Sequence, residues 1–191
     1  FASGVYNKKE EIQKITNTKK TKINKEAIKN VVKELEFAKK PVLYIGGGII
    51  NSGDKATELF NEFASLTNFP VTATLMGLGV YPASGKSWIG MLGMHGTYEA
   101  NMVMHDCDFM MCIGARFDDR ITGRVDAFSP NSLKVHIDID PSSINKNVRV
   151  DIPIVGDVTE VLRLLLEEFK INNKKTAISD VKEWWKQIDV W

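Results

Sequence analysis

The segment from Cys112 to Arg124, CIGARFDDRITGR, carries a dense set of charged side chains that could bind or activate a ligand. It contains three guanidinium groups and two carboxylates, on Arg116, Arg120, Arg124, Asp118 and Asp119. Adjacent carboxylates on an extended chain point to opposite sides, and neighbouring arginines keep them ionised, which disfavours acid catalysis. Guanidinium groups offer forked donors to phosphate. Two interpretations stay open: a surface ion-pair cluster, and a clamp for a diphosphate or the edge of a flavin.

A second candidate is the run Gly46-Gly47-Gly48, which follows the apolar residues VLYI. Glycines let the backbone approach a phosphate, and a following helix presents its N-terminus to negative charge. The match to GxGxxG is incomplete, because Asn51 stands at the third glycine position and no acidic residue ends the next predicted strand. Plain NAD recognition by this half is therefore disfavoured. A nucleotide contact and a tight strand-to-helix turn remain equal alternatives.

The third candidate combines Gly114 and its neighbours with Asp138, which lies 24 residues further on, as 138 minus 114 gives. This spacing is close to that of a glycine turn followed by a ribose-binding carboxylate. It favours the second half of the sheet as the place for an adenosine moiety. The alternative is that Asp138 and Asp140 are turn residues before Pro141, and for Asp140 this interpretation is preferred.

The fourth candidate is the loop Leu92–Gly96, LGMHG, with His95 at its centre. An imidazole titrates near neutral pH, so His95 could act as a general base. No nucleophile with an orienting acid lies beside it, which favours a ligand contact or a loop hydrogen bond. We interpret His105 and His136 as structural.

Apolar periodicity and turn residues predict the elements that must position these segments. We expect helices at 24–40, 52–68, 97–107 and 158–169, with Asn24 as an N-cap. We expect strands at 42–48, 69–75, 108–115, 133–140 and 151–157, with a glycine-punctuated loop at 76–96. Alternating strands and helices predict a parallel sheet covered on both faces, in which ligands bind at the carboxyl ends of the strands. Three of the four candidate segments directly follow a predicted strand.

Composition excludes several classes of function. The 191 residues are 43% hydrophobic and carry a net charge of +1, which gives no global electrostatic case for nucleic acid or membrane binding. Eleven lysines lie in the first 40 residues, interleaved with Glu, Thr and Asn, which predicts a solvated linker. Cys107 and Cys112 lack CxxC spacing and predict buried thiols in a reducing cytoplasm. No run is long enough to span a membrane, no signal peptide is evident, and the start at Phe1 suggests an excised piece.

Taken together, MLGMHGTYEAN and GARFDDRITGR resemble the central domain of the acetohydroxyacid synthase family of thiamine-diphosphate enzymes. The resemblance extends from about Lys39 to Phe169. It implies an α/β, Rossmann-like three-layer domain with a six-stranded parallel sheet of the DHS-like NAD/FAD-binding type. The expected boundaries are a linker at 1–23, the domain at 24–170, and at 171–191 a linker with a short helix, whose paired tryptophans dock on a neighbouring domain.

The resemblance also implies an activity for the full-length family member. It condenses pyruvate with a second pyruvate or with 2-ketobutyrate, releasing CO₂, in branched-chain amino-acid biosynthesis. It uses thiamine diphosphate, Mg²⁺ and an FAD without a net redox part, and it is a cytoplasmic homo-oligomer with a possible regulatory small subunit. The thiamine and metal motifs belong to other domains. This chain alone is therefore expected to be inactive, with weak FAD retention or none.

By match to the family, the flavin-contacting positions are Gly46, Gly47, Gly48, Thr74, Leu75, Met76, Leu92, Gly93, Met94, His95, Gly114, Ala115, Arg116, Asp118, Arg120, Asp138, Ile139, Asp157 and Val158. The resemblance further implies a substrate and inhibitor channel lined by Met94, Asp119 and Arg120. Arg120 would meet the substrate carboxylate and Asp118 would orient Arg120, while Arg116 would pair with cofactor groups. No catalytic residue and no metal ligand are expected in this chain.

Two other classes remain as alternatives. One is the middle domain of a sibling thiamine enzyme, of the glyoxylate carboligase, oxidase or decarboxylase type, or of a deacetylase-like NAD-binding relative. The other is a purely structural domain with a vestigial site. The GARFDDR segment favours the acetohydroxyacid synthase family over the first alternative, and the ligand-type residues kept by all three strand-end segments argue against the second.

Overall fold

The computed structural model describes residues 22–172 and 181–191, and its centre is a parallel sheet. The strands are β1 (Pro41–Ile45), β2 (Val71–Ala73), β3 (Trp88–Met91), β4 (Phe109–Ile113), β5 (Leu133–Asp138) and β6 (Ile152–Val155). They form one six-stranded sheet in the order β3-β2-β1-β4-β5-β6, and every pair is parallel. The order reverses between β1 and β4, which makes their carboxyl ends the switch point of the sheet.

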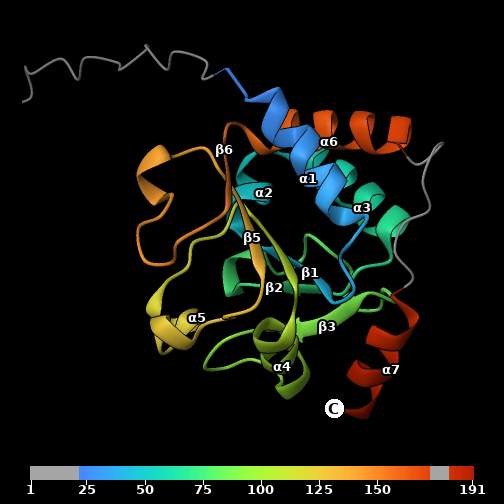
Figure 1. Cartoon of the computed structure of the whole chain (residues 1–191), viewed down its shortest axis with the longest axis vertical. Coiled ribbons are helices and arrows are strands. Elements are labelled where there is room, and N and C mark those ends of the chain that lie inside the picture. Colours follow the sequence, from blue (N-terminus) through green and yellow to red (C-terminus); the bar gives the residue numbers. More distant parts are fainter. Residues whose placement is uncertain (1–21, 173–180) are drawn as a thin grey trace, which may run out of the picture.

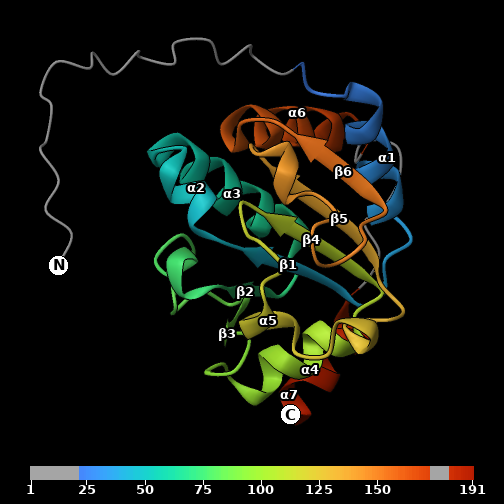
Figure 2. The same ribbon diagram turned by 90° about the vertical axis from the view of Figure 1, so that its left-hand side faces the viewer.

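Helices cover both faces of this sheet and give a three-layer α/β domain, as expected. Figure 2 shows α1 (Lys25–Leu35), α3 (Asp54–Thr67) and α6 (Val158–Asn172) on one side, and α4 (Tyr98–Asp106) on the other with α7 (Lys182–Val190). Short elements follow several strands: α2 (Gly47–Asn51), α5 (Asp119–Thr122), and the 3₁₀ turns η1 (Leu75–Gly77), η2 (Val125–Ala127) and η3 (Pro141–Ser143). These short elements form much of the edge that carries the candidate segments.

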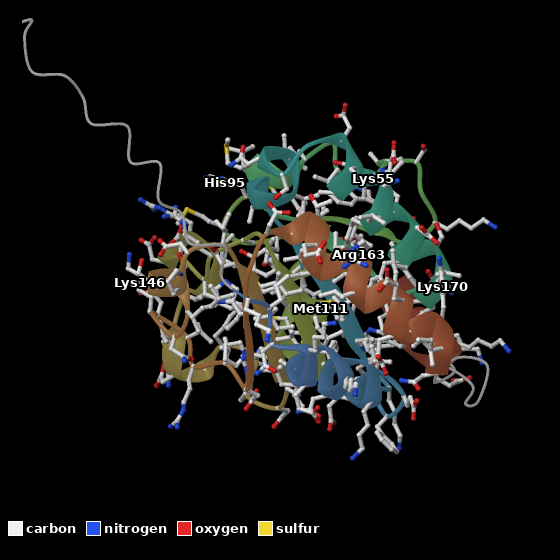
Figure 3. The ribbon with its side chains drawn as sticks, turned by 90° about the horizontal axis from the view of Figure 1, so that it is seen from above. Lys55, His95, Met111, Lys146, Arg163 and Lys170 are labelled. Carbon is white, nitrogen blue, oxygen red and sulfur yellow. The ribbon has the colours of Figure 1, made fainter. Side chains whose placement is uncertain are left out.

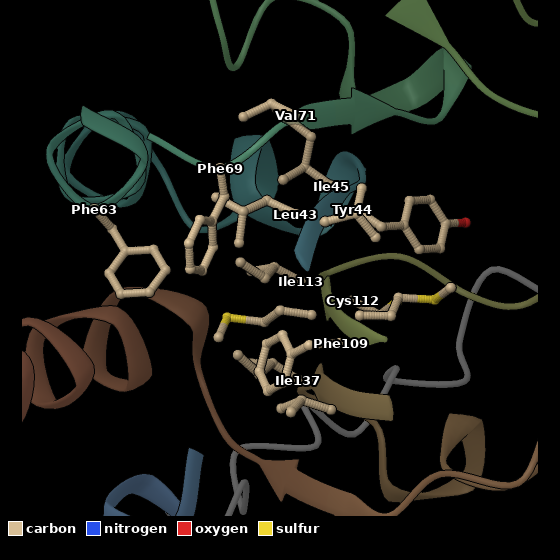
Figure 4. Packing of buried hydrophobic residues seen from close by; sticks show 14 of the residues in the cluster. Leu43, Tyr44, Ile45, Phe63, Phe69, Val71, Phe109, Cys112, Ile113 and Ile137 are labelled. Carbon is tan, nitrogen blue, oxygen red and sulfur yellow. The ribbon is translucent and has the colours of Figure 1, made fainter. Parts of the chain in front are cut away.

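The central strands β1 and β4 are mostly apolar because both of their faces are covered. All residues of β1 and β4 are buried. In Figure 4, Phe63 of α3 approaches one side of the sheet, whereas Tyr44 and Cys112 point to the other side. The ring centroids of Phe63 and Phe169 lie 5.6 Å apart, which joins α3 to α6 above the sheet. Asn24 caps α1 as predicted, accepting from the backbone N–H groups of Glu26 and Ala27.

Three local expectations were wrong. The predicted loop 76–96 contains a strand, β3, whose four residues include Gly90 at φ +96°, so it is too short and irregular to show a strand period. The glycine run does not extend β1, since the chain enters α2 at Gly47. The extended chain expected for the paired aspartates gives way to α5, which begins at Asp119.

The C-terminal helix α7 packs on this domain rather than projecting as a linker. Trp184 is 2% exposed and donates its Nε1–H to the carbonyl of Pro41 over 3.1 Å. The ammonium group of Lys40 lies 5.1 Å from the centroid of the same indole. Trp185 donates to the carbonyl of Asn68 over 2.9 Å. Both contacts are at the amino ends of strands, and Figure 1 shows α7 to the right of the strands and α5 to their left.

Trp184→Ala tests this docking. Removing a buried indole and its hydrogen bond is expected to destabilise the chain by about 3–5 kcal/mol. Chemical denaturation followed by circular dichroism measures the loss. Trp185→Ala, at a half-exposed position on the same helix, is the control and should cost clearly less. Equal losses for the two variants would contradict the packing of α7 described here.

Candidate functional site

Backbone hydrogen bonds at the carboxyl ends join all six strands into one continuous edge. At each step the residue after one strand donates its N–H to the carbonyl of a neighbouring strand. The bonds are Leu92 to Ala73 (3.4 Å), Thr74 to Ile45 (2.9 Å), Gly46 to Ile113 (3.1 Å), Gly114 to Ile137 (2.9 Å) and Gly156 to Asp138 (3.0 Å). The loops that begin at these residues, which contain most of the positions predicted from the sequence, are therefore neighbours in space.

The glycines at the switch point serve backbone packing. A Cβ atom on Gly48 would lie 2.6 Å from the Cα of Gly114, and one on Gly46 would lie 2.5 Å from the carbonyl oxygen of Gly114. The N–H of Gly48 donates to that same carbonyl over 2.9 Å. Gly114 itself has φ +58°, a conformation that favours glycine. The loops after β1 and β4 thus touch backbone to backbone, which supports the tight-turn interpretation for Gly46 and Gly48.

Exposed apolar side chains follow several of the strands at this edge. The side chains of Leu75, Met76, Met94 and Ile139 are 65–72% exposed, and each stands within three residues of a strand end. A Cβ on Gly47 would lie 3.1 Å from that of Met76, so η1 and α2 are in contact. Large apolar side chains exposed along one edge of a protein are typical of a surface that binds a ligand or another protein.

The charged segment places its ionic groups outward at the same edge. The guanidinium of Arg116 lies 3.1 Å from the carboxylate of Asp118. The Nε atom of Arg120 lies 4.0 Å from the carboxylate of Asp119. Asp118 therefore pairs with Arg116 and not, as the resemblance implied, with Arg120. Asp118 is the N-cap residue of α5, and its carbonyl accepts from the N–H groups of Ile121 and Thr122.

Two loops meet where the channel residues were expected. The N–H of Met94 donates to the carbonyl of Arg120 over 3.1 Å. A Cβ on Gly93 would lie 2.6 Å from that same carbonyl, so the loop after β3 is in direct contact with α5. The structure thus brings Met94, Asp119 and Arg120 together. His95 is exposed, and Figure 3 shows it at the same end of the molecule as Lys146.

The backbone of the charged segment is bonded by side chains that sequence analysis did not assign to the site. The hydroxyl of Tyr44 donates to the carbonyl of Arg116 over 2.8 Å. Nδ2 of Asn147 donates to the carbonyl of Phe117 over 2.8 Å. One signal for Tyr44 was present in the sequence. The ends of three strands, β1, β4 and β5, read Tyr-Ile-Gly, Cys-Ile-Gly and His-Ile-Asp, so each has a residue that can donate a hydrogen bond at the same position. The sequence contains no comparable signal for Asn147.

His136 is buried, as expected for a structural histidine. Its Nε2 atom lies 2.8 Å from the carbonyl of Ala115, and because a carbonyl only accepts, Nε2 carries the hydrogen. Nδ1 is buried without a hydrogen-bond partner. Burial lowers the pKa of His136, against the opposing effects of the Ala115 carbonyl and the charge of Asp138. The imidazole is therefore neutral near pH 7, and its 3.8 Å contact with Asp138 is not an ion pair.

The carboxylates after β5 and β6 accept bonds from nearby backbone N–H groups. Asp138 accepts from the N–H of Asp140 over 2.8 Å. Asp140 accepts from the N–H of Ser142 over 2.9 Å, which confirms it as a turn residue. Asp157 accepts from the N–H of Thr159 over 2.9 Å and caps α6. A ribose contact by Asp138 and a flavin contact by Asp157 stay predictions.

Three further predicted positions have buried side chains, namely Leu92, Ala115 and Val158. Only their backbone atoms can face a ligand at the edge. Beside the charged segment lies a small hollow, open to solvent, lined by Arg116, Phe117, Asp118, Ser143, Lys146 and Asn147.

Two kinds of site are not found within residues 22–172 and 181–191. This part of the chain contains no cluster of three or more His, Cys, Asp or Glu side chains suited to a metal ion. None of its helices has both the length and the apolar character needed to cross a membrane. Cys107 and Cys112 are free and buried, as expected, and burial raises the pKa of the Cys107 thiol to about 11.

Gly48→Ala tests the backbone contact at the switch point. The new methyl group has no room between two main chains, so we expect a loss of about 3 kcal/mol in the free energy of unfolding, or failure to fold. Gly47→Ala is the matched control, because its methyl group meets the exposed Met76 and the change should stay within about 1 kcal/mol. Denaturation of both variants decides the point, and a tolerated Gly48→Ala would contradict the geometry.

His136→Gln tests the neutral imidazole through pH. The pKa of His136 in the folded chain is below its unfolded value of about 6.5. Its neutral form therefore contributes stability above that pH, and the contribution is lost as pH falls through the folded pKa. Urea denaturation from about pH 7.5 to about pH 5 should show a steeper loss in the wild type than in the variant. Parallel curves would mean that His136 is not buried in the neutral form.

Comparisons with known proteins agree with the fold. The family described as "Thiamine pyrophosphate enzyme, central domain" matches residues 28–165. The acetolactate synthase isozyme 3 large subunit of Escherichia coli K12 is 46% identical over 168 residues, which cover 88% of this chain and 29% of that protein. An acetolactate synthase large subunit of Haemophilus influenzae is 47% identical, also over 168 residues, 88% of this chain and 29% of that protein.

A third relative, an acetolactate synthase large subunit of Buchnera aphidicola from Schizaphis graminum, is 48% identical over 171 residues, 90% of this chain and 29% of that protein. The chain thus spans about 29% of the length of these curated relatives. The family match covers most of the parallel sheet and its connecting helices. This chain belongs to the thiamine pyrophosphate enzyme family, as a central domain.

Proposed function

We propose that this chain is the central domain of an acetolactate synthase large subunit and that the carboxyl edge of its sheet holds FAD. The observation that carries the proposal is the identity of 46–48% with large subunits of that enzyme over 88–90% of the chain. Within the chain, the domain proper comprises residues 24–170.

The whole enzyme, in this proposal, joins two pyruvates, or pyruvate and 2-ketobutyrate, with release of CO₂ in branched-chain amino-acid biosynthesis. Thiamine diphosphate and Mg²⁺ are held by its other domains, so this chain alone is inactive. The relatives are named large subunits, which supports a regulatory small subunit as partner. The whole protein acts in the cytoplasm as a homo-oligomer.

The side chains at the edge fit the chemistry of FAD. The cofactor combines an anionic diphosphate with two planar ring systems, one of them the flavin. The exposed guanidinium of Arg116 offers forked donors to the diphosphate. Exposed apolar side chains, on Leu75, Met76, Met94 and Ile139, offer contacts to the rings. When bound, the flavin fills this edge and takes no net redox part in the carboligation.

In this proposal, residues of this chain bind the cofactor and orient the substrate. Asp118 holds the guanidinium of Arg116 in place for the diphosphate. Met94, Asp119 and Arg120 line the approach to the reaction centre, and Arg120 attracts the carboxylate of pyruvate. The carboxylate of Asp138 accepts from a ribose hydroxyl.

Titration of the chain with FAD tests the proposal, with flavin fluorescence and the visible spectrum as signals and with ADP and NAD as competitors. We expect weak, saturable binding of FAD that ADP competes for. Arg116→Ala should weaken it about 10- to 100-fold, the effect of losing a hydrogen bond to a charged group.

The control is Arg163→Ala, on α6, where the guanidinium pairs with Glu160 and Glu167 (Figure 3). It should leave FAD binding unchanged. Binding of ADP but not of FAD would mean that the part of the site that holds the flavin requires the other domains. Equal FAD affinity in Arg116→Ala and wild type, or displacement of FAD by NAD but not ADP, would contradict the assignment.

A further inference from the structure

The loop that carries Arg116 combines a bonded backbone with exposed charged side chains. The side chains of Arg116 and Asp118 are 62% and 44% exposed. Between them Phe117 is 4% exposed and points into the protein. We call residues 114–118 the arginine loop. Two outward charged side chains flank one inward aromatic ring in this loop. This arrangement is kept only if the main chain of the loop is held in one conformation.

Three side chains beneath this loop form a row across the sheet. Tyr44 pairs with Cys112 in the register of β1 and β4, and Cys112 pairs with His136 in the register of β4 and β5. Side chains at paired positions of parallel strands lie on the same face. Figure 4 shows Tyr44 and Cys112 pointing to the same side. We call Tyr44, Cys112 and His136 the polar row.

The polar row binds the carbonyls of the arginine loop. Tyr44 donates to the carbonyl of Arg116 over 2.8 Å. Both Cys112, at 3.2 Å, and His136, at 2.8 Å, contact the carbonyl of Ala115. Burial raises the pKa of the Tyr44 hydroxyl and of the Cys112 thiol, so both keep the hydrogen they donate. The row therefore presents three donors to two adjacent carbonyls.

Phe117 and Asn147 complete the attachment. The ring of Phe117 lies 5.8 Å from that of Tyr44, 5.2 Å from that of His136 and 5.8 Å from that of Phe128, between centroids. Asn147 donates to the carbonyl of Phe117 over 2.8 Å. Three consecutive carbonyls, those of residues 115–117, are thus each bonded by a side chain that comes from outside the loop.

Folding alone does not require this arrangement. A buried polar side chain costs free energy unless it is hydrogen-bonded, and an apolar residue of similar shape would fill the same space. The other residues of β1 and β4 are apolar. Tyr44 and Cys112 are therefore where these two central strands depart from their apolar pattern, and with His136 of β5 they bond the carbonyls of the arginine loop. The sheet also buries the polar side chains of Thr72 and Lys134, but these donate to carbonyls outside the loop.

We propose that Tyr44, His136 and Asn147 are positioning residues that hold the arginine loop in its ligand-binding conformation before a ligand arrives. The inference rests on the proposed function for its ligand, the diphosphate of FAD. A guanidinium bonds phosphate with directional donors, so an ordered loop avoids the entropy cost of fixing Arg116 during binding. Loss of one of these donors should loosen the loop and weaken the ligand without removing any group that touches it.

Two substitutions test the proposal. One is isosteric and the other changes an exposed residue, and each has a matched control. Tyr44→Phe removes one buried donor, and Thr67→Val removes a buried hydroxyl that donates to the carbonyl of Phe63 near the amino ends of the strands. Asn147→Ala removes an exposed donor, and Asn172→Ala removes a similar donor at the end of α6. Because Asn147 is exposed, its variant decides the question if Tyr44→Phe does not fold.

Two measurements are made on the 191-residue chain and its variants. Without ligand, amide hydrogen exchange is followed in residues 115–122. With ligand, FAD and ADP are titrated as above. Tyr44→Phe and Asn147→Ala should speed exchange in this segment about five- to tenfold and weaken FAD by a similar factor. The two controls should change neither value, even where denaturation shows an equal loss of stability.

The outcomes separate this inference from the proposed function. Unchanged exchange in both test variants overturns the positioning role, whatever FAD does. Faster exchange with unchanged FAD affinity in a wild type that binds FAD also overturns it. If the wild type binds neither FAD nor ADP, the proposed FAD site of this chain is not supported, the family assignment stands, and the exchange result alone decides whether these residues order the loop. Faster exchange together with weaker FAD supports both.

Discussion

The contact between the loops after β1 and β4 determines where the rest of the edge can lie. Gly48 and Gly114 meet backbone to backbone at the point where the strand order reverses. Any side chain there would force the loops apart, and with them α2 on one side and the arginine loop on the other. The closeness of the loops also explains why the charged side chains start at Arg116, since the two residues before it are occupied by packing.

The polar row shows how an apolar sheet supports an ionic surface. The cost of burying a hydroxyl, a thiol and an imidazole is offset by the carbonyls that they bond. The same carbonyls would otherwise need water or a regular strand partner, because buried backbone groups without partners are rare in folded proteins. Nδ1 of His136 is buried without a hydrogen-bond partner, and burial lowers the pKa of this histidine.

The sequence predicted the layered parallel fold and the position of the candidate segments after the strands, because both follow from local patterns. Apolar runs ending in glycine predicted β1 and β4, and Asn24 predicted the start of α1. What it missed depends on distant pairings. The bond from Tyr44 to Arg116 spans 72 residues, and that from Asn147 to Phe117 spans 30. The local pattern at the strand ends marked Tyr44 as unusual but did not show which loop its hydroxyl bonds, and no pattern showed that α5 begins at Asp119.

The docking of α7 has a consequence in mechanical terms. Trp184 is bonded to Pro41, the first residue of β1, while the last residue of β1 is followed by Gly46 at the opposite edge. A strand of five residues is about 17 Å long and is stiff because it is bonded on both sides. β1 is therefore a stiff connection between α7 at its amino end and the glycine loop at its carboxyl end. A displacement of α7 along the direction of β1 would be transmitted to the loop Gly46–Gly48, and the helices on the two faces of the sheet would not need to move.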